Sequence, residues 1–175
     1  MRERLLSFIR SRSATAAIEF AFIAPVLIMM MASVVECGRL FQVYNATNRV
    51  ATQIAIVYAD CSDNPTGTCG TEASSYMTSQ FISNIVPQLT VSSLSFQVFQ
   101  VLMSGTTPTV VYCAPSGATL SASQTSAAQA ALSNGQSGVI VTATYSHTLQ
   151  FFSTLMGPYL DSVLTPSYTV VQLKG

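Results

Sequence analysis

The chain has 175 residues, of which 49% are hydrophobic and only 8% are charged, and its formal net charge is zero. This balance argues against a nucleic-acid-binding protein that neutralises phosphates, because the chain has no basic surface to offer. Beyond an apolar N-terminal segment, the length suits one domain of about a hundred residues. Its surface, polar but nearly uncharged, is of a kind common in extracytoplasmic proteins.

The first predicted element is a membrane-spanning segment behind a basic leader. Four arginines lie within the first twelve residues, and residues 20–35 (FAFIAPVLIMMMASVV) contain no charged side chain. This run is about one bilayer crossing long. The arginines predict that the N-terminus stays in the cytoplasm and that everything after Val35 lies outside. The alternatives are a buried helix of a soluble protein and a cleaved secretory signal, but no small-x-small site follows the run.

The helical pattern continues beyond the apolar run. Apolar positions recur at spacings of three and four, with polar side chains on the opposite side. The apolar positions are Leu40, Val43, Thr47, Val50, Ile54 and Val57. One helix is therefore predicted over residues 15–59, about 65 Å long and bent or loosened at Pro25. Its second half should pack on the sheet that follows.

Residues 60–175 are predicted to form an extracytoplasmic α+β domain with an antiparallel sheet. A turn-rich segment leads to a short helix that ends at Pro87. Strand patterns follow over residues 93–98, 107–113 and 138–151, and residues 167–174 are expected at an edge of the sheet. The third strand should be half buried, with alternate residues from Val139 to Leu149 facing the core. Residues 114–138 are expected to form a long loop with one turn of helix, and residues 151–161 an apolar loop near the membrane or a partner.

No catalytic or cofactor-binding motif is recognisable in the sequence. The single histidine, His147, lies on the apolar side of a predicted strand, where a structural role is expected. We find no nucleophile setting, no Gly-rich phosphate loop and no HExxH motif. A zinc site built from Cys61, Cys69, Cys113 and His147 is conceivable but lacks the paired spacings of structural zinc sites. We therefore predict no enzyme activity, no cofactor and no metal.

The cysteines suit an oxidising compartment. Cys61, Cys69 and Cys113 lie beyond the apolar run, whereas Cys37 lies on the predicted helix just past it. Cys37 and Cys61 are separated by about 36 Å of helix, so they cannot pair within one chain. Cys61 and Cys69 flank a turn and are the preferred disulfide. Cys113 could instead pair with either of them.

The N-terminal residues carry a resemblance to a known family. Residues 13–41, SATAAIEFAFIAPVLIMMMASVVECGRLF, resemble the N-terminus of the TadE-like family, the minor pseudopilins of bacterial tight-adherence (Tad/Flp) pili. The shared features, in order, are a basic leader, small residues, "EFA", an early proline and "E-x-G-R". The resemblance implies a pilin-like α+β fold, in which a long N-terminal helix packs on a small antiparallel sheet with one short extra helix.

The same resemblance implies how the chain would mature and assemble. Residues 1–14 would be a cytoplasmic leader that a prepilin peptidase removes between Ala14 and Thr15, which makes Glu19 the fifth mature residue. Glu19, Phe20 and Pro25 would serve assembly, and the alternative is that Glu19 only marks the cytoplasmic border. The implied partners are other pilins or pseudopilins, inner-membrane pilus assembly proteins, the peptidase and membrane lipid.

One departure from the family pattern keeps a second interpretation open. Leaders of this kind usually end in Gly, whereas this chain has Ala14. A TadG-like relative, which resembles this chain in its membrane segment, need not be cleaved. In that case an uncleaved helix would anchor a periplasmic module that binds the pilus secretion machinery.

Overall fold

A computed structural model describes residues 12–61, 82, 84, 86, 87, 89–150 and 163–174. The predicted apolar loop over 151–161 lies outside these residues. So does most of the predicted short helix before Pro87, although Ile82 and Asn84 are helical and Ile82 is buried.

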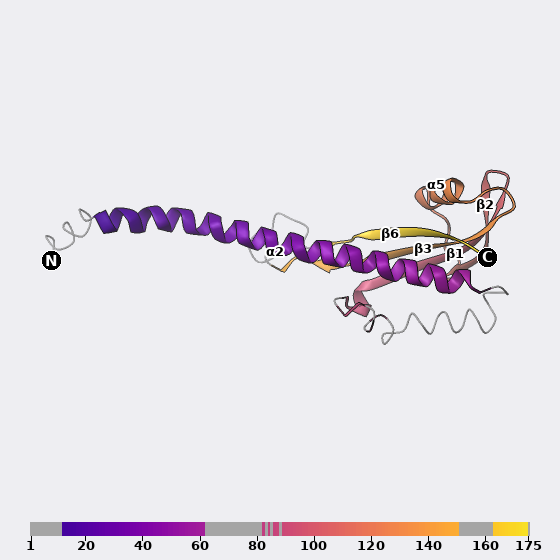
Figure 1. The fold of residues 1–175 in the computed structure, drawn as a ribbon, viewed down its shortest axis with the longest axis horizontal. Helices are drawn as coiled ribbons and strands as arrows, with labels where there is room; N and C mark the ends of the chain where they lie inside the picture. The colour runs from indigo at the N-terminus through magenta and orange to yellow at the C-terminus, as the bar shows by residue number, and fades with distance from the viewer. Residues whose placement is uncertain are drawn as a thin grey trace.

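Helix α2 (Arg12–Ala59) dominates the fold as a single 48-residue element. It ends where the sequence pattern predicts and begins earlier than Thr15. Pro25 lies inside it, and the helix continues on both sides of this proline. In Figure 1 the N-terminal half of α2 extends away from the rest of the protein, while its C-terminal half lies along the sheet.

The main sheet has four antiparallel strands in the order β2–β1–β3–β6. A 3₁₀ turn, η1 (Val91–Ser93), leads into β1 (Leu94–Ser104), which is followed by β2 (Thr107–Ala114), β3 (Ser137–Tyr145) and β6 (Ser167–Leu173). Gly105, with φ of 66°, makes the two-residue turn between β1 and β2. A strand lies at each of the four predicted positions, although β1 runs on to Ser104, and the edge position of β6 is confirmed.

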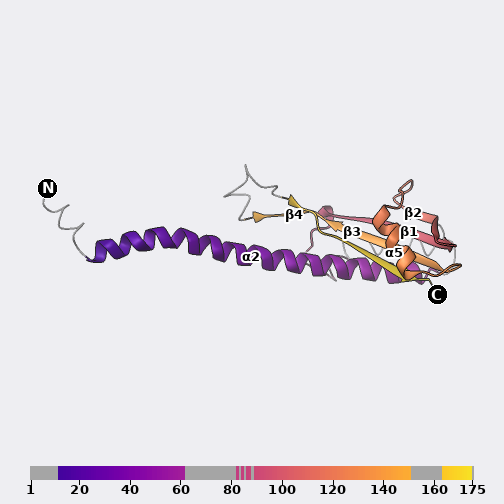
Figure 2. The ribbon, with the colours of Figure 1, turned by 90° about the horizontal axis from the view of Figure 1, so that it is seen from above.

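The prediction of one strand running from Gly138 past His147 is wrong. Strand β3 ends at Tyr145, and His147 lies in β4 (His147–Thr148), which pairs with β5 (Val163–Leu164) in a separate two-stranded sheet. The Ser146 N–H still donates to the Ser93 carbonyl at 2.8 Å, in register with the β1–β3 ladder. The ladder stops there because β1 begins at Leu94 and the 3₁₀ turn η1 precedes it. Figure 2 shows β4 beyond the end of β3, beside α2.

Both faces of the main sheet are covered, so the molecule has three layers. Helix α2 lies on one face, and the core there joins Val50, Ile54 and Ala55 to Val139 and Val141. Helix α5 (Ala122–Ala131) lies on the other face, where Ala128 and Leu132 contact Phe99 and Ile140. The expectation of a half-buried third strand is wrong because α5 covers the second face. The expected single helical turn is a helix of 10 residues. The α+β class is confirmed.

Candidate functional site

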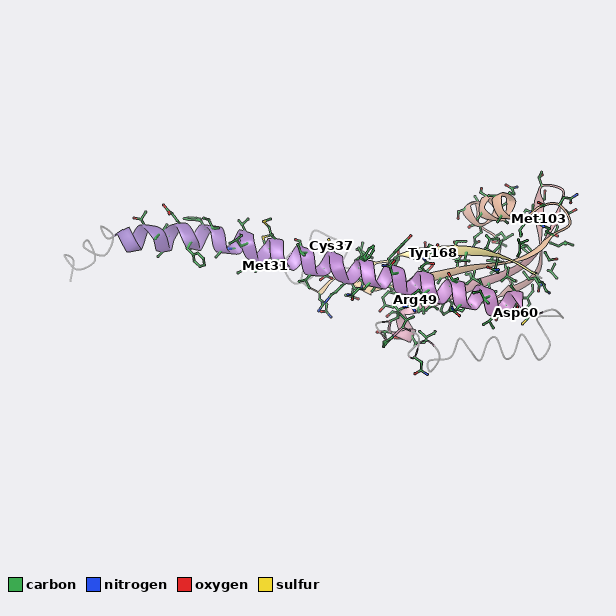
Figure 3. All side chains as sticks on the ribbon, viewed as in Figure 1. Met31, Cys37, Arg49, Asp60, Met103 and Tyr168 are labelled. Carbon is green, nitrogen blue, oxygen red and sulfur yellow. The ribbon has the colours of Figure 1, made fainter. Side chains whose placement is uncertain are left out.

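The N-terminal half of α2 is an uncovered apolar surface. Its most apolar 18-residue window has a mean hydropathy of 2.3, and none of it is buried within the protein. The exposed side chains there include Phe20, Phe22, Ile23, Ile28, Met30, Met31 and Val34. Figure 3 shows Met31 on this extended part of the helix and Arg49 on the part along the sheet. By length and composition, α2 can cross a membrane.

Helical geometry brings together the predicted cleavage and assembly residues. Ala14, Thr15, Glu19 and Phe20 all lie in the first turns of α2. Thr15 and Glu19 are four residues apart, so they lie on the same side of the helix. Glu19 and Pro25 are exposed, and Phe20 is 67% exposed. Glu19 is the only charged residue between Ser13 and Val35. It is therefore the one charged side chain on this apolar surface.

The C-terminal half of α2 contacts the sheet through the predicted stripe. Val50 is 1% exposed and Ile54 3%, whereas Gln42, Asn45 and Gln53 on the other side are exposed. Tyr44 also meets Tyr168 of β6 edge to face, with ring centroids 6.1 Å apart. This half is therefore fixed to the domain, and the apolar half projects from it.

The first residue after the apolar run is a buried carboxylate. Glu36 is 3% exposed, and its Oε1 accepts a hydrogen bond from the Gln150 backbone N–H at 3.1 Å. The same oxygen lies 3.6 Å from His147 Nε2. One turn further along α2, Arg39 Nη1 donates to the side-chain oxygen of Gln150. The segment 147–150 is thus held against the helix by two of the helix side chains.

Sequence reasoning missed this junction. The predicted structural role of His147 is compatible with it, but Glu36 lies far away in the chain and no local pattern joins the two. One feature of the sequence could have indicated it. Glu36 directly follows the uncharged run of residues 20–35, and an acidic residue that is buried needs a partner.

A shallow polar cleft of about 410 Å³ adjoins this junction. It is lined by Arg39, Gln42, Val43, Thr90, Ser93, Tyr145, Ser146, His147, Thr148 and Gln150. Within the described part of the chain, no three His, Cys, Asp or Glu side chains gather where a metal ion could bind. The cleft therefore offers hydroxyl and amide groups rather than a set of metal ligands.

The cysteines separate into bonded and free thiols. Cys61 is disulfide-bonded, whereas Cys37 is an exposed free thiol and Cys113 a half-buried free thiol. The alternative that Cys113 pairs with Cys61 is therefore wrong. The preferred partner, Cys69, lies outside the described residues, so that pairing stays a prediction.

These features define a class of protein: an α+β domain carried on one long helix whose free half can anchor it in a membrane. Within this class, the family model described as TadE-like protein matches residues 14–55, which confirms the resemblance found in the N-terminal sequence. The match lies entirely within α2 and includes every predicted cleavage and assembly residue. No curated protein and no solved structure matches the chain.

Proposed function

We propose that this protein is a minor pseudopilin, a structural subunit needed to assemble a Tad/Flp-type pilus. One observation carries the proposal: the TadE-like match over residues 14–55 coincides with a helix whose first half is apolar and uncovered. A catalytic role has no support in the sequence motifs. The uncovered half would first lie in the inner membrane and then contact neighbouring pilins.

Maturation by a prepilin peptidase is part of this proposal. The peptidase would cut between Ala14 and Thr15, at the start of α2, and leave residues 1–14 in the cytoplasm. The cut would create an α-ammonium group one helical turn from Glu19. The four leader arginines favour the matching topology, with the N-terminus inside and the sheet in the periplasm.

The proposed partners follow from the two halves of the chain. Other pilins or pseudopilins and inner-membrane assembly proteins would contact the apolar helix, which also contacts lipid. The sheet domain would stay in the periplasm, where a Cys61–Cys69 disulfide would close the segment after α2.

Ala14 supports a second candidate function. Because a Gly usually precedes the cut in such leaders, a chain with Ala14 could stay uncleaved. It would then be a TadG-like anchored module that binds the pilus secretion machinery. In this case α2 would only tether the domain.

Intact mass of the full chain separates the two candidates. In a host with the peptidase, we expect the wild-type chain to lose residues 1–14. The variant Ala14→Phe should accumulate at full length, because a bulky side chain blocks the site, whereas Ala14→Gly should be cut at least as well as wild type. Retention of Met1 by the wild-type chain, with Ala14→Gly cut in the same host, would favour the anchored module.

A further inference from the structure

Glu36 and His147 face each other across the junction between α2 and β4. Their side chains are only 4% and 13% exposed, and 3.6 Å separates Glu36 Oε1 from His147 Nε2. This distance is longer than a charge-assisted hydrogen bond, which measures about 2.7–2.9 Å. Within the described part of the chain, neither His147 Nε2 nor Glu36 Oε2 has any hydrogen-bond partner. The two groups are therefore buried, adjacent and incompletely bonded.

A proton on Nε2 resolves this arrangement. A neutral imidazole has a donor on one ring nitrogen and an acceptor on the other, and a carboxylate only accepts. A bare Nε2 would place two acceptors against each other out of water, which is costly for a buried carboxylate. With its proton on Nε2, His147 becomes a donor, and a small side-chain rotation closes the gap to Glu36.

We propose that His147 carries its proton on Nε2 and that this N–H donates a hydrogen bond to the Glu36 carboxylate. This bond holds the β4 end of the domain against α2. The bond lies at the first residue after the apolar run, where the uncovered part of the helix begins. It therefore holds the β4 end of the domain against the point where the free half of α2 begins. The inference rests on the described contacts and stands whether or not the chain is a pseudopilin.

The neighbouring groups support a hydrogen bond rather than a metal bridge. Gln150 already donates its backbone N–H to Glu36 Oε1, and Arg39 places a cation one helical turn away. Among the described residues, Tyr145 is a further titratable neighbour, with its ring centroid 6.5 Å from that of His147. A bridging metal would have only two protein ligands among the described residues, fewer than zinc sites use.

Nuclear magnetic resonance of the histidine ring tests the proposal directly. His147 is the single histidine, so ¹⁵N-histidine labelling of the full chain in detergent micelles gives unambiguous signals, provided that the purification tag contains no histidine. We expect Nε2 to be protonated, with its proton exchanging slowly with water. The variant Glu36→Gln keeps an acceptor but loses the charge, so this proton should exchange at least tenfold faster. Glu36→Ala, which removes the acceptor, should speed this exchange further and shift the ring signals toward those of a histidine without a partner.

Hydrogen exchange of the backbone supplies the second readout. Both Glu36 variants should reduce the protection of amides at residues 147–150 at least tenfold and leave those of β1 and β3 unchanged. Glu19→Gln, which removes a carboxylate from the same helix, is the matched control and should change neither readout. Protonation on Nδ1 with a bare Nε2, or ring signals that ignore Glu36→Ala, would overturn the proposal. So would a change in the wild-type signals on treatment with EDTA, since a metal would then occupy Nε2.

Discussion

At the scale of single residues, Tyr58 shows how burial at the end of α2 tunes a side chain. It is 4% exposed, and its ring stacks on that of Tyr112 in β2, with centroids 6.5 Å apart. Burial, with a smaller contribution from the Tyr112 phenol, raises the pKa of Tyr58 from 10.0 to about 12. The folded protein therefore favours the neutral phenol more strongly than the unfolded chain does.

This shift predicts a loss of stability in alkali. The contribution of Tyr58 is fully present below pH 10 and disappears as the pH rises through about 12. The loss should be roughly 2 kcal/mol. We expect Tyr58→Phe to remove it, so the denaturant midpoint of wild type should fall more steeply than that of the variant between pH 10 and pH 12. Parallel pH profiles would mean that Tyr58 ionises as easily in the folded protein as in the unfolded chain.

At the scale of elements, the stability of the domain depends on the buried apolar stripe of α2. Ile54 is 3% exposed in the core shared with β3, while Ile56, two residues on, is 42% exposed. Ile54→Asp would bury an unpaired charge, so we expect it to lower the free energy of unfolding by several kcal/mol or to unfold the domain altogether. The matched control Ile56→Asp should change stability by less than about 0.5 kcal/mol. Chemical denaturation of the full chain in detergent measures both, and equal stability of the two variants would mean that the stripe is not buried.

Elements were predictable where the pattern is local. The end of α2 and the strands follow from spacings of three and four or of two, which each segment carries within itself. Helix α5 was predicted as a single turn, and its full length was not, because its Ala, Ser and Gln residues give no apolar periodicity. A local signal was present: Ser121 and Gln124 form a capping box, with the Ser121 side chain accepting from Gln124 N–H.

Other features could not be predicted because they depend on distant segments. The break after Tyr145 depends on where the neighbouring strands begin, at Leu94 after η1 and at Ser167, both remote in sequence. Gln124 is buried because its amide donates to Thr142 of β3 at 2.9 Å. The Glu36–His147 junction likewise exists only after α2 has packed on the sheet. The candidate cleavage and assembly residues, in contrast, lie within one short segment, residues 14–25, and their roles stay a prediction.

At the scale of the whole molecule, α2 has an uncovered apolar half, which contains Glu19, and a half packed on the sheet, after which Asp60 follows. Asp60 directly follows the helix and is exposed (Figure 3), whereas Glu19 is exposed on the apolar half of α2. A carboxylate in hydrocarbon costs on the order of a few kcal/mol near the bilayer centre and less toward its edge, and such residues are usually paired. Within the proposed function, the new α-ammonium at Thr15 would be that partner, first in the same chain and then in a neighbouring subunit.

Replacing Glu19 with Gln should therefore weaken assembly. The amide cannot form an ion pair with an α-ammonium group, so the variant should lose the attraction that favours cleaved subunits in the correct register. Its sheet domain should fold normally, because Glu19 is exposed on the half of α2 that projects from the domain, and cleavage at Ala14 should continue. We expect fewer assembled pili and weaker co-purification with other pilins than in wild type at equal protein levels. Asp60→Asn, which removes a carboxylate from the other end of α2, should assemble normally. Full assembly of Glu19→Gln would show that Glu19 only marks the cytoplasmic border, while equal loss in Asp60→Asn would point to net charge rather than to pairing at Glu19.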